Sequence, residues 1–381
     1  MVAEVHNLQI GNQSAIADKI TFMINLNHNY IGIVNGDLVS LWKRGSDKME
    51  FSTYQNRKPL NEQLPLAAPL SIHVCPSTFC NFKCKYCVHS LGTPTSLPNG
   101  IKKGFMEYDT FTKLVEQLKE FPSKIKLLNF AYLGEPLLNE KIPDMVKLAK
   151  VSNVSDRVEI VSNGSMLTHA LSDKLVDAGL DRLRISIQGL DSKEYYYMSK
   201  FRIDYSRFLE ELRYLYKRSR NSSTKIYIKT VDAVVKTEER KKKFFDDFSE
   251  CCDNLNIENL IPISNECDIS GLKKEFNDGF FGNKVRNTKI CSEVFYTIVI
   301  TPEGDVYPCC TMGRPPIICG NILKEDIVQI WNGEKLRNLR IKMLHEGYHS
   351  FSTCKECGVP LYQTSSEDYL DDYIESLLKK Y

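Results

Sequence analysis

Long apolar runs are missing from this chain. The longest one near the start, residues 64–74, contains Pro65 and Pro69 and is too short to span a bilayer. Residues 1–13 lack the basic start and the apolar core of a secretion signal. A charge excess is missing too, because 50 Lys and Arg face 48 Asp and Glu, for a net charge of +2. These absences predict a cytoplasmic protein with no membrane partner and no general attraction to nucleic acid.

What is present indicates a globular protein. Hydrophobic residues make up 42% and charged residues 26% of the 381 positions, which is typical of two or three folded domains. Internal repeats and low-complexity tracts are absent. Thirteen cysteines in a reducing compartment favour metal ligands or redox groups over a disulfide framework.

Residues 1–68 form an N-terminal extension of unknown role. The residues around Asn35 and Gly36 predict a β-hairpin between 30–34 and 37–42, since Asn-Gly suits a tight type I′ turn. A short helix is possible at residues 15–23. The polar, proline-bearing stretch that follows is expected to be a linker.

Residues 69–264 alternate strand and helix patterns, which predicts a parallel sheet with crossover helices. Asp109 is a candidate cap for the first crossover helix, and the run Lys241–Lys242–Lys243 lies among acidic residues on a predicted solvated helix face. The fold class is therefore α/β, an open and partial (βα)6 TIM-like barrel. The six strands are predicted at residues 70–74, 126–133, 158–161, 182–187, 225–231 and 257–263.

After residue 264 the strand-helix alternation gives way to a cysteine-rich pattern. We expect a small separate module at residues 265–364 and a closing helix at 365–381. In parallel α/β sheets the loops after the strands carry the chemistry, so the candidate site residues are sought there.

Three cysteines follow the first barrel strand in a C-x3-C-x2-C spacing, namely Cys80, Cys84 and Cys87. Three thiolates on one short loop can ligate three irons of a [4Fe-4S] cluster and leave the fourth iron open for a small molecule. A zinc knuckle with a distant fourth ligand is the alternative. It is disfavoured because zinc sites usually show two C-x2-C or Cys/His ligand pairs of similar local character.

This loop and its position resemble the radical S-adenosylmethionine (SAM) superfamily. The resemblance implies a [4Fe-4S] cluster whose open iron binds the amino and carboxylate groups of SAM, and reductive cleavage of SAM to a 5′-deoxyadenosyl radical that abstracts a substrate hydrogen. Tyr86 matches the family's residue beside the adenine. Gly134, Glu135 and Pro136 resemble the motif that binds the SAM amino group, with Leu133 where the family often has glycine.

Two further strand ends agree with the resemblance. Ser162 and Asn163 follow the third strand, and Ser186 and Gln188 end the fourth. The resemblance implies contacts from these groups to the SAM carboxylate and ribose. Gln188 replaces the acidic or Asn residue often found at its position.

A second cysteine group, Cys291, Cys309, Cys354 and Cys357, opens with a C-x12-G-x4-C spacing around Gly304. This spacing resembles the SPASM module, in its shortened "twitch" form with one auxiliary [4Fe-4S] cluster. It is particularly similar to that of the aminocyclitol dehydrogenase of the butirosin pathway. Cys310 could replace Cys309, and a structural zinc or cluster staple is the alternative reading.

A fully ligated auxiliary cluster suits electron transfer, so we expect oxidation of a sugar or aminocyclitol-like small molecule. The required base is predicted to be Asp232, with Glu258 and Lys229 as further candidates. A flavodoxin- or ferredoxin-type protein would supply electrons. Modification of a precursor peptide is the second hypothesis, and a non-catalytic iron-sulfur or zinc-binding protein is the third.

Overall fold

The computed structural model describes strands β1 (Ile20–Leu26), β2 (Asn29–Val34) and β3 (Asp37–Trp42), and residues 58–98, 100–264, 266–280, 282–309 and 316–381. The chain divides into two compact units, Met1–Arg57 and Lys58–Tyr381. The first unit ends before the expected boundary at residue 68. The barrel and the cysteine-rich module share the second.

The first unit contains a three-stranded antiparallel sheet in the order β1-β2-β3. Val34 pairs with Asp37, so the predicted hairpin is confirmed. The possible helix at residues 15–23 is wrong where the structure describes it. Ile20–Leu26 is a strand, in which β-branched and apolar residues favour extended backbone.

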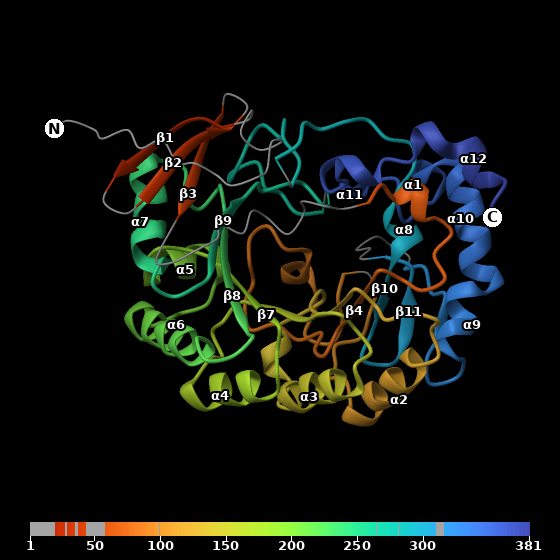
Figure 1. Cartoon of the computed structure of the whole chain (residues 1–381), viewed down its shortest axis with the longest axis horizontal. Helices are drawn as coiled ribbons and strands as arrows, with labels where there is room; N and C mark the ends of the chain where they lie inside the picture. The colour runs from red at the N-terminus through yellow and green to blue at the C-terminus, as the bar shows by residue number, and fades with distance from the viewer. Residues whose placement is uncertain are drawn as a thin grey trace, which may run out of the picture. The chain divides into compact units, whose positions relative to one another are not determined.

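Six consecutive parallel strands form the centre of the second unit, in the order β4-β5-β6-β7-β8-β9. Figure 1 shows α2, α3, α4 and α6 along one side of these strands. The α/β barrel prediction is confirmed. The strands are β4 (Ser71–Val74), β5 (Leu127–Phe130), β6 (Val158–Ser162), β7 (Arg182–Ile187), β8 (Lys225–Val231) and β9 (Asn254–Glu258), and the helices between them are α2 (Tyr108–Leu118), α3 (Ile142–Ser152), α4 (His169–Asp177), α5 (Ser192–Ser199), α6 (Tyr205–Ser219) and α7 (Glu238–Phe248).

The two faces of this sheet differ in chemistry. Apolar residues such as Ile72, Ile160 and Ile185 pack into one core with the helices. Because side chains alternate along a strand, their neighbours face the other side, which is the barrel lumen. This lumen face carries polar and charged residues: His73, Asn129, Glu159, Arg184, Lys229 and Glu258.

Three local predictions need correction. Strand β5 ends at Phe130 rather than at residue 133, because Tyr132 adopts a positive φ of 106° and begins the loop. Strand β9 covers Asn254–Glu258, since its pairing with β8 sets its position, and the apolar residues 260–261 lie in the loop beyond. Asp109 lies in the first turn of α2, where Glu107 occupies the cap position.

The C-terminal part extends the same sheet. Strand β10 (Thr297–Ile300) pairs parallel with β4, and β11 (Asp305–Tyr307) and β12 (Gly320–Asn321) continue antiparallel. The expected helix at 365–381 is reduced to short turns and α12 (Ile374–Leu378). The other helices here are α1 (Leu60–Gln63), α8 (Glu293–Tyr296), α9 (Ile327–Asn332), α10 (Glu334–Glu346) and α11 (Val359–Tyr362), and the 3-10 turns of the second unit are η2 (Val88–Leu91), η3 (Pro136–Leu138), η4 (Tyr348–Ser350), η5 (Ser366–Asp368) and η6 (Asp371–Tyr373).

In the described ranges, no helix has the length and apolar character needed to cross a membrane. The twelve described cysteines form no disulfide.

Candidate active site

The loop between β4 and η2 carries Cys80, Cys84 and Cys87. Its start is fixed to a second loop, because the Thr78 amide donates to Gly104 O (3.0 Å) and the Gly104 amide donates to Thr78 Oγ1 (2.7 Å). His89 Nε2 contacts Thr78 O at 2.8 Å. The cysteine loop is therefore held by hydrogen bonds to the second loop and to His89.

The three thiols fit a metal cluster in their donor chemistry. Burial raises the pKa of Cys80 to about 12, raises that of Cys84 well above its usual range, and raises that of Cys87. The neighbouring thiols add to the shift at Cys80 and Cys84, because like charges repel. Cationic iron would reverse these shifts and hold the sulfurs as thiolates.

Gly134 brings the loop after β5 against the cysteine loop. A Cβ atom at Gly134 would lie 2.4 Å from Phe79 O and 2.5 Å from Ser77 O. The next amide, of Glu135, donates to Phe79 O (2.8 Å). Only glycine permits this approach, which places Glu135 next to the cysteine loop.

The Glu135 carboxylate joins two strand ends. Oε1 accepts from Ser162 Oγ (2.6 Å) and from the Leu137 amide (3.0 Å), and Oε2 accepts from the Asn163 amide (2.7 Å). Burial raises the pKa of Glu135, while these donors oppose the shift. Pro136 begins the turn η3 after Glu135. The structure thus brings together Glu135, Ser162 and Asn163, which the resemblance assigned to contacts with SAM.

Asn81 completes this network and was missed by the sequence reasoning. Its Oδ1 accepts from Asn163 Nδ2, and its Nδ2 donates to Ser165 Oγ, both at 2.8 Å. A polar residue between two cluster cysteines was the only available signal. Its partners lie more than eighty positions away, which no local pattern reveals.

Tyr86 and Gln188 are bonded to each other. The Tyr86 hydroxyl donates to Gln188 Oε1 at 2.6 Å, and Gln188 Nε2 donates to Ser186 O at 3.4 Å. Burial raises the pKa of Tyr86 well above its usual range, so the phenol stays neutral. The fourth strand end therefore meets the cysteine loop through this bond.

A network of charges lines the lumen. Glu258 contacts Lys229 Nζ (2.6 Å) and Arg184 (3.1 Å), and Arg184 also contacts Glu159 (3.3 Å). Burial lowers the pKa of Lys229. His73 contacts Asn129 Nδ2 at 3.2 Å, and burial, with the nearby Arg184 charge, lowers its pKa to about 4. These groups offer donors and acceptors to a polar molecule.

Asp232 lies just past β8, with both carboxylate oxygens engaged. Oδ2 is 2.7 Å from Lys273 Nζ, and Oδ1 accepts from the Leu260 amide at 3.0 Å. Its role as a base stays a prediction.

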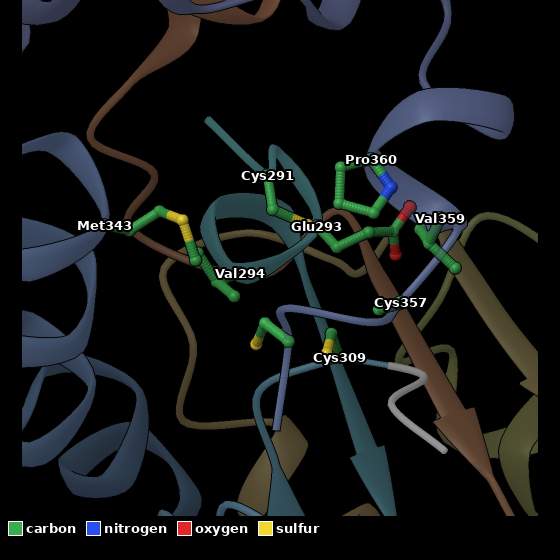
Figure 2. Close-up of a pocket in the computed structure, with 9 residues that line it drawn as sticks. Cys291, Glu293, Val294, Cys309, Met343, Cys357, Val359 and Pro360 are labelled. Atoms are coloured by element: carbon green, nitrogen blue, oxygen red, sulfur yellow. The ribbon is translucent and has the colours of Figure 1, made fainter. Parts of the chain in front are cut away.

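Three segments of the chain bring four cysteines around one small cavity, shown in Figure 2: Cys291, Cys309, Cys354 and Cys357. Cys291 precedes α8, Cys309 follows β11, and Cys354 and Cys357 lie on the loop before α11. Glu293 also lines the cavity and was not foreseen. Cys310 lies outside the described residues.

Burial also raises the pKa of the described cavity thiols for which a shift is resolved: Cys354 to about 12, Cys357 upward, and Cys291 well above its usual range. The donor set therefore fits a second cluster for the same reason as the first. In the described ranges, no group of three His, Cys, Asp or Glu side chains is arranged to hold a single metal ion.

The comparisons agree with this arrangement. Residues 74–233 match the radical SAM superfamily, and residues 291–358 match SPASM, an iron-sulfur cluster-binding domain. The chain thus contains a radical SAM domain and, C-terminal to it, a SPASM domain. A radical SAM domain implies a [4Fe-4S] cluster and SAM, and a SPASM domain implies auxiliary iron-sulfur chemistry.

Among curated relatives, the S-adenosyl-L-methionine-dependent 2-deoxy-scyllo-inosamine dehydrogenase of Niallia circulans is 24% identical over 304 residues, 78% of this chain and 97% of the relative. A probable GTP 3′,8-cyclase of Methanococcus maripaludis is 35% identical over 117 residues, which is 30% of this chain and 35% of the cyclase. The chain therefore matches about a third of the cyclase's length.

Among solved structures, Streptococcus suis SuiB bound to precursor peptide SuiA is similar, with a TM-score of 0.55 and 17% identity over 83% of this chain and 77% of SuiB. At this identity the likeness concerns the fold.

Proposed function

We propose that the chain is a radical SAM oxidoreductase that oxidises a small carbohydrate or aminocyclitol-like molecule. The observation that carries this proposal is the cavity lined by Cys291, Cys309, Cys354 and Cys357. Four thiolates would complete the ligation of a cubane cluster, so that cluster would transfer electrons rather than bind substrate. An electron outlet is what an oxidation requires.

When bound, SAM with the first cluster would supply a hydrogen-atom acceptor, and the auxiliary cluster would supply an electron acceptor. A substrate C–H bond would then break, and the carbinol carbon would become a carbonyl. The hydroxyl proton must go to a protein group. The chain's own residues would then orient SAM through Glu135, Ser162 and Asn163, and surround the substrate with the polar lumen. The Tyr86–Gln188 pair would border the adenosyl group.

Asp232 remains a proposed proton acceptor. The Lys229–Glu258 pair is the second candidate, because it faces the lumen and burial lowers the pKa of Lys229. Removing a general base typically costs 10²–10⁴-fold in rate. If Asp232 is the base, Asp232→Asn should slow product formation by about that factor while SAM cleavage continues. If the Lys229–Glu258 pair is the base, Lys229→Met should have this effect instead.

The substrate class is supported by the lumen and by one relative. The lumen presents charged and amide groups suited to hydroxyl and amino substituents. The dehydrogenase of Niallia circulans, which is named for an aminocyclitol substrate, aligns along most of both chains.

The proposal is tested by supplying the anaerobically reconstituted protein with SAM, a reductant and a panel of polyols and aminocyclitols. We expect one oxidised product for each 5′-deoxyadenosine. Cys309→Ala with Cys354→Ala should keep SAM cleavage and lose the oxidised product. The control is Cys319→Ala, a buried thiol outside the cavity. A redox-neutral product would contradict the proposal.

Modification of a precursor peptide is the second candidate, favoured by the likeness to SuiB with its peptide bound. It predicts a small precursor gene beside this one and tight binding of the encoded leader. A protein that holds iron and never cleaves SAM would instead be a non-catalytic iron-sulfur protein, which is the third candidate.

A further inference from the structure

Basic side chains gather around the cysteine loop. Lys83 and Lys85 lie on the loop itself, and others come from segments packed against it. We call this group the cluster-loop patch. It consists of Lys83, Lys85, Lys103, Lys200, Arg202 and Lys236.

Backbone hydrogen bonds bring these cations together. The Lys83 amide donates to Ser199 O (2.7 Å) and the Lys85 amide donates to Met198 O (2.9 Å), which places the loop at the end of α5, just before Lys200. The Thr78–Gly104 bonds bring Lys103 to the same loop.

Charge effects agree with this closeness. Burial and then the Lys83 charge lower the pKa of Lys103. Lys85 lowers the pKa of Tyr197 most, and Lys236 and Lys200 add to the shift. Lys85, Lys200 and Lys236 therefore act on one neighbour, Tyr197, and Lys83 acts on Lys103.

The positive charge of the patch is not cancelled by ion pairs. Within the described ranges, none of the six cations forms an ion pair with a carboxylate, whereas Lys241, Lys242 and Lys243 each pair with an acid on α7. The nearby carboxylates have other partners, since Asp191 caps α5 and Glu194 pairs with Arg240. In a chain with a net charge of only +2, these six cations form a local excess of positive charge.

Exposed aromatic rings accompany the cations. Tyr196 is 44% and Tyr197 is 54% exposed, and Lys85 Nζ lies 3.3 Å from the Tyr197 ring centroid. Lys200 and Arg202 lie 5.4 and 5.5 Å from the Tyr196 ring centroid. Aromatic and arginine side chains are enriched at protein interfaces.

We propose that the cluster-loop patch is the docking surface for an acidic one-electron carrier protein of the flavodoxin or ferredoxin class. This inference rests on the proposed function, which needs electrons delivered to the cluster of Cys80, Cys84 and Cys87. Two patch residues lie between those cysteines, so a carrier docked here has a short electron path. Opposite charges raise the association rate by roughly 10–10³-fold, and redox encounters use small interfaces.

The test compares wild type with the triple variant Lys83→Glu, Lys200→Glu and Arg202→Glu. Lys147→Glu with Lys174→Glu is the control, because these exposed lysines lie on the outer helices α3 and α4. Binding of a reduced flavodoxin is titrated at low and high ionic strength, and SAM cleavage is measured with flavodoxin and with dithionite. We expect the triple variant to bind flavodoxin about tenfold more weakly or worse, to lose the salt dependence, and to keep dithionite-driven cleavage.

Equal flavodoxin affinity in wild type and triple variant would overturn the proposal, as would equal weakening in the control. If the triple variant loses iron, Lys200→Glu with Arg202→Glu, both outside the cysteine loop, decides by the same titration. Competition by an acidic precursor peptide, with no flavodoxin binding by wild type, would also overturn it. A wild type that cleaves no SAM with either reductant contradicts the proposed function instead, and the binding titration still decides the docking surface.

Discussion

At the residue scale, the site depends on how a few buried polar atoms are shared between loops. Glu135 accepts three hydrogen bonds from two loops, and Asn81, on the cysteine loop, bonds to Asn163 on one of them. The cysteines, Glu135 and Asn163 could be predicted from the sequence because their spacing and strand-end positions are local features. The Tyr86–Gln188 bond and the role of Asn81 could not, since packing chooses partners far apart in the chain.

Glu135→Gln is expected to weaken SAM binding by about tenfold or more and to lower stability by about 1–3 kcal/mol. The reason is that a glutamine NH₂ would face a backbone donor, either the Asn163 amide or the Leu137 amide, and leave a buried group unsatisfied. SAM binding by calorimetry and unfolding by denaturant check this. Glu140→Gln, an exposed neighbour, should change neither quantity; an equal effect there would refute the argument.

His73 predicts a specific pH dependence of stability. Its pKa is about 4 in the folded protein against 6.5 when exposed, so the unfolded state binds more protons between these values. The stability it contributes is therefore present above pH 6.5 and lost as the pH falls toward 4. At 1.36 kcal/mol per unit the loss is about 3 kcal/mol.

His73→Gln should flatten the stability profile between about pH 4 and about pH 6.5 relative to wild type. Denaturant unfolding at several pH values measures this. His345→Gln, at an exposed position on α10, should leave the profile unchanged. An unflattened profile in His73→Gln would contradict the account of the lumen.

At the element scale, the strand-helix alternation fixed six barrel strands, because each strand must bury one apolar face against helices. It misplaced β9, where the apolar residues 260–261 were mistaken for the strand. It also missed that β10 joins the barrel sheet beside β4, since a parallel pairing over more than two hundred positions leaves no local pattern. The pairing of strands in the sheet sets both the position of β9 and the place of β10, and hydrophobic periodicity along the chain does not reveal this pairing.

Gly134→Ala is expected to separate two elements, because its Cβ would collide with the backbone oxygens of Phe79 and Ser77. Overpacking of this kind costs about 1–3 kcal/mol, and we expect reduced iron at the first site. Iron content and thermal unfolding check this. Gly271→Ala, where nothing lies within 4 Å, is the control. A stable Gly134→Ala protein with full iron would show that the loops tolerate the displacement.

At the scale of the whole molecule, two cysteine sites lie in one compact unit. The loop of Cys80, Cys84 and Cys87 follows β4, and β4 pairs with β10, which follows Cys291 and α8. A shared sheet thus connects the cysteine loop after β4 to the cavity lined by Cys291. Sequence spacing predicted both cysteine groups, but it could not show that their domains pair strand to strand.

The central claim is that these seven cysteines hold two clusters, and iron per chain after anaerobic reconstitution tests it most directly. Wild type should hold about eight irons, and the triple alanine variants of Cys80, Cys84 and Cys87, and of Cys291, Cys354 and Cys357, should each hold about four. If wild type holds about four irons and the first variant almost none, the second cavity carries no iron-sulfur cluster. The oxidising function would then lose its electron acceptor.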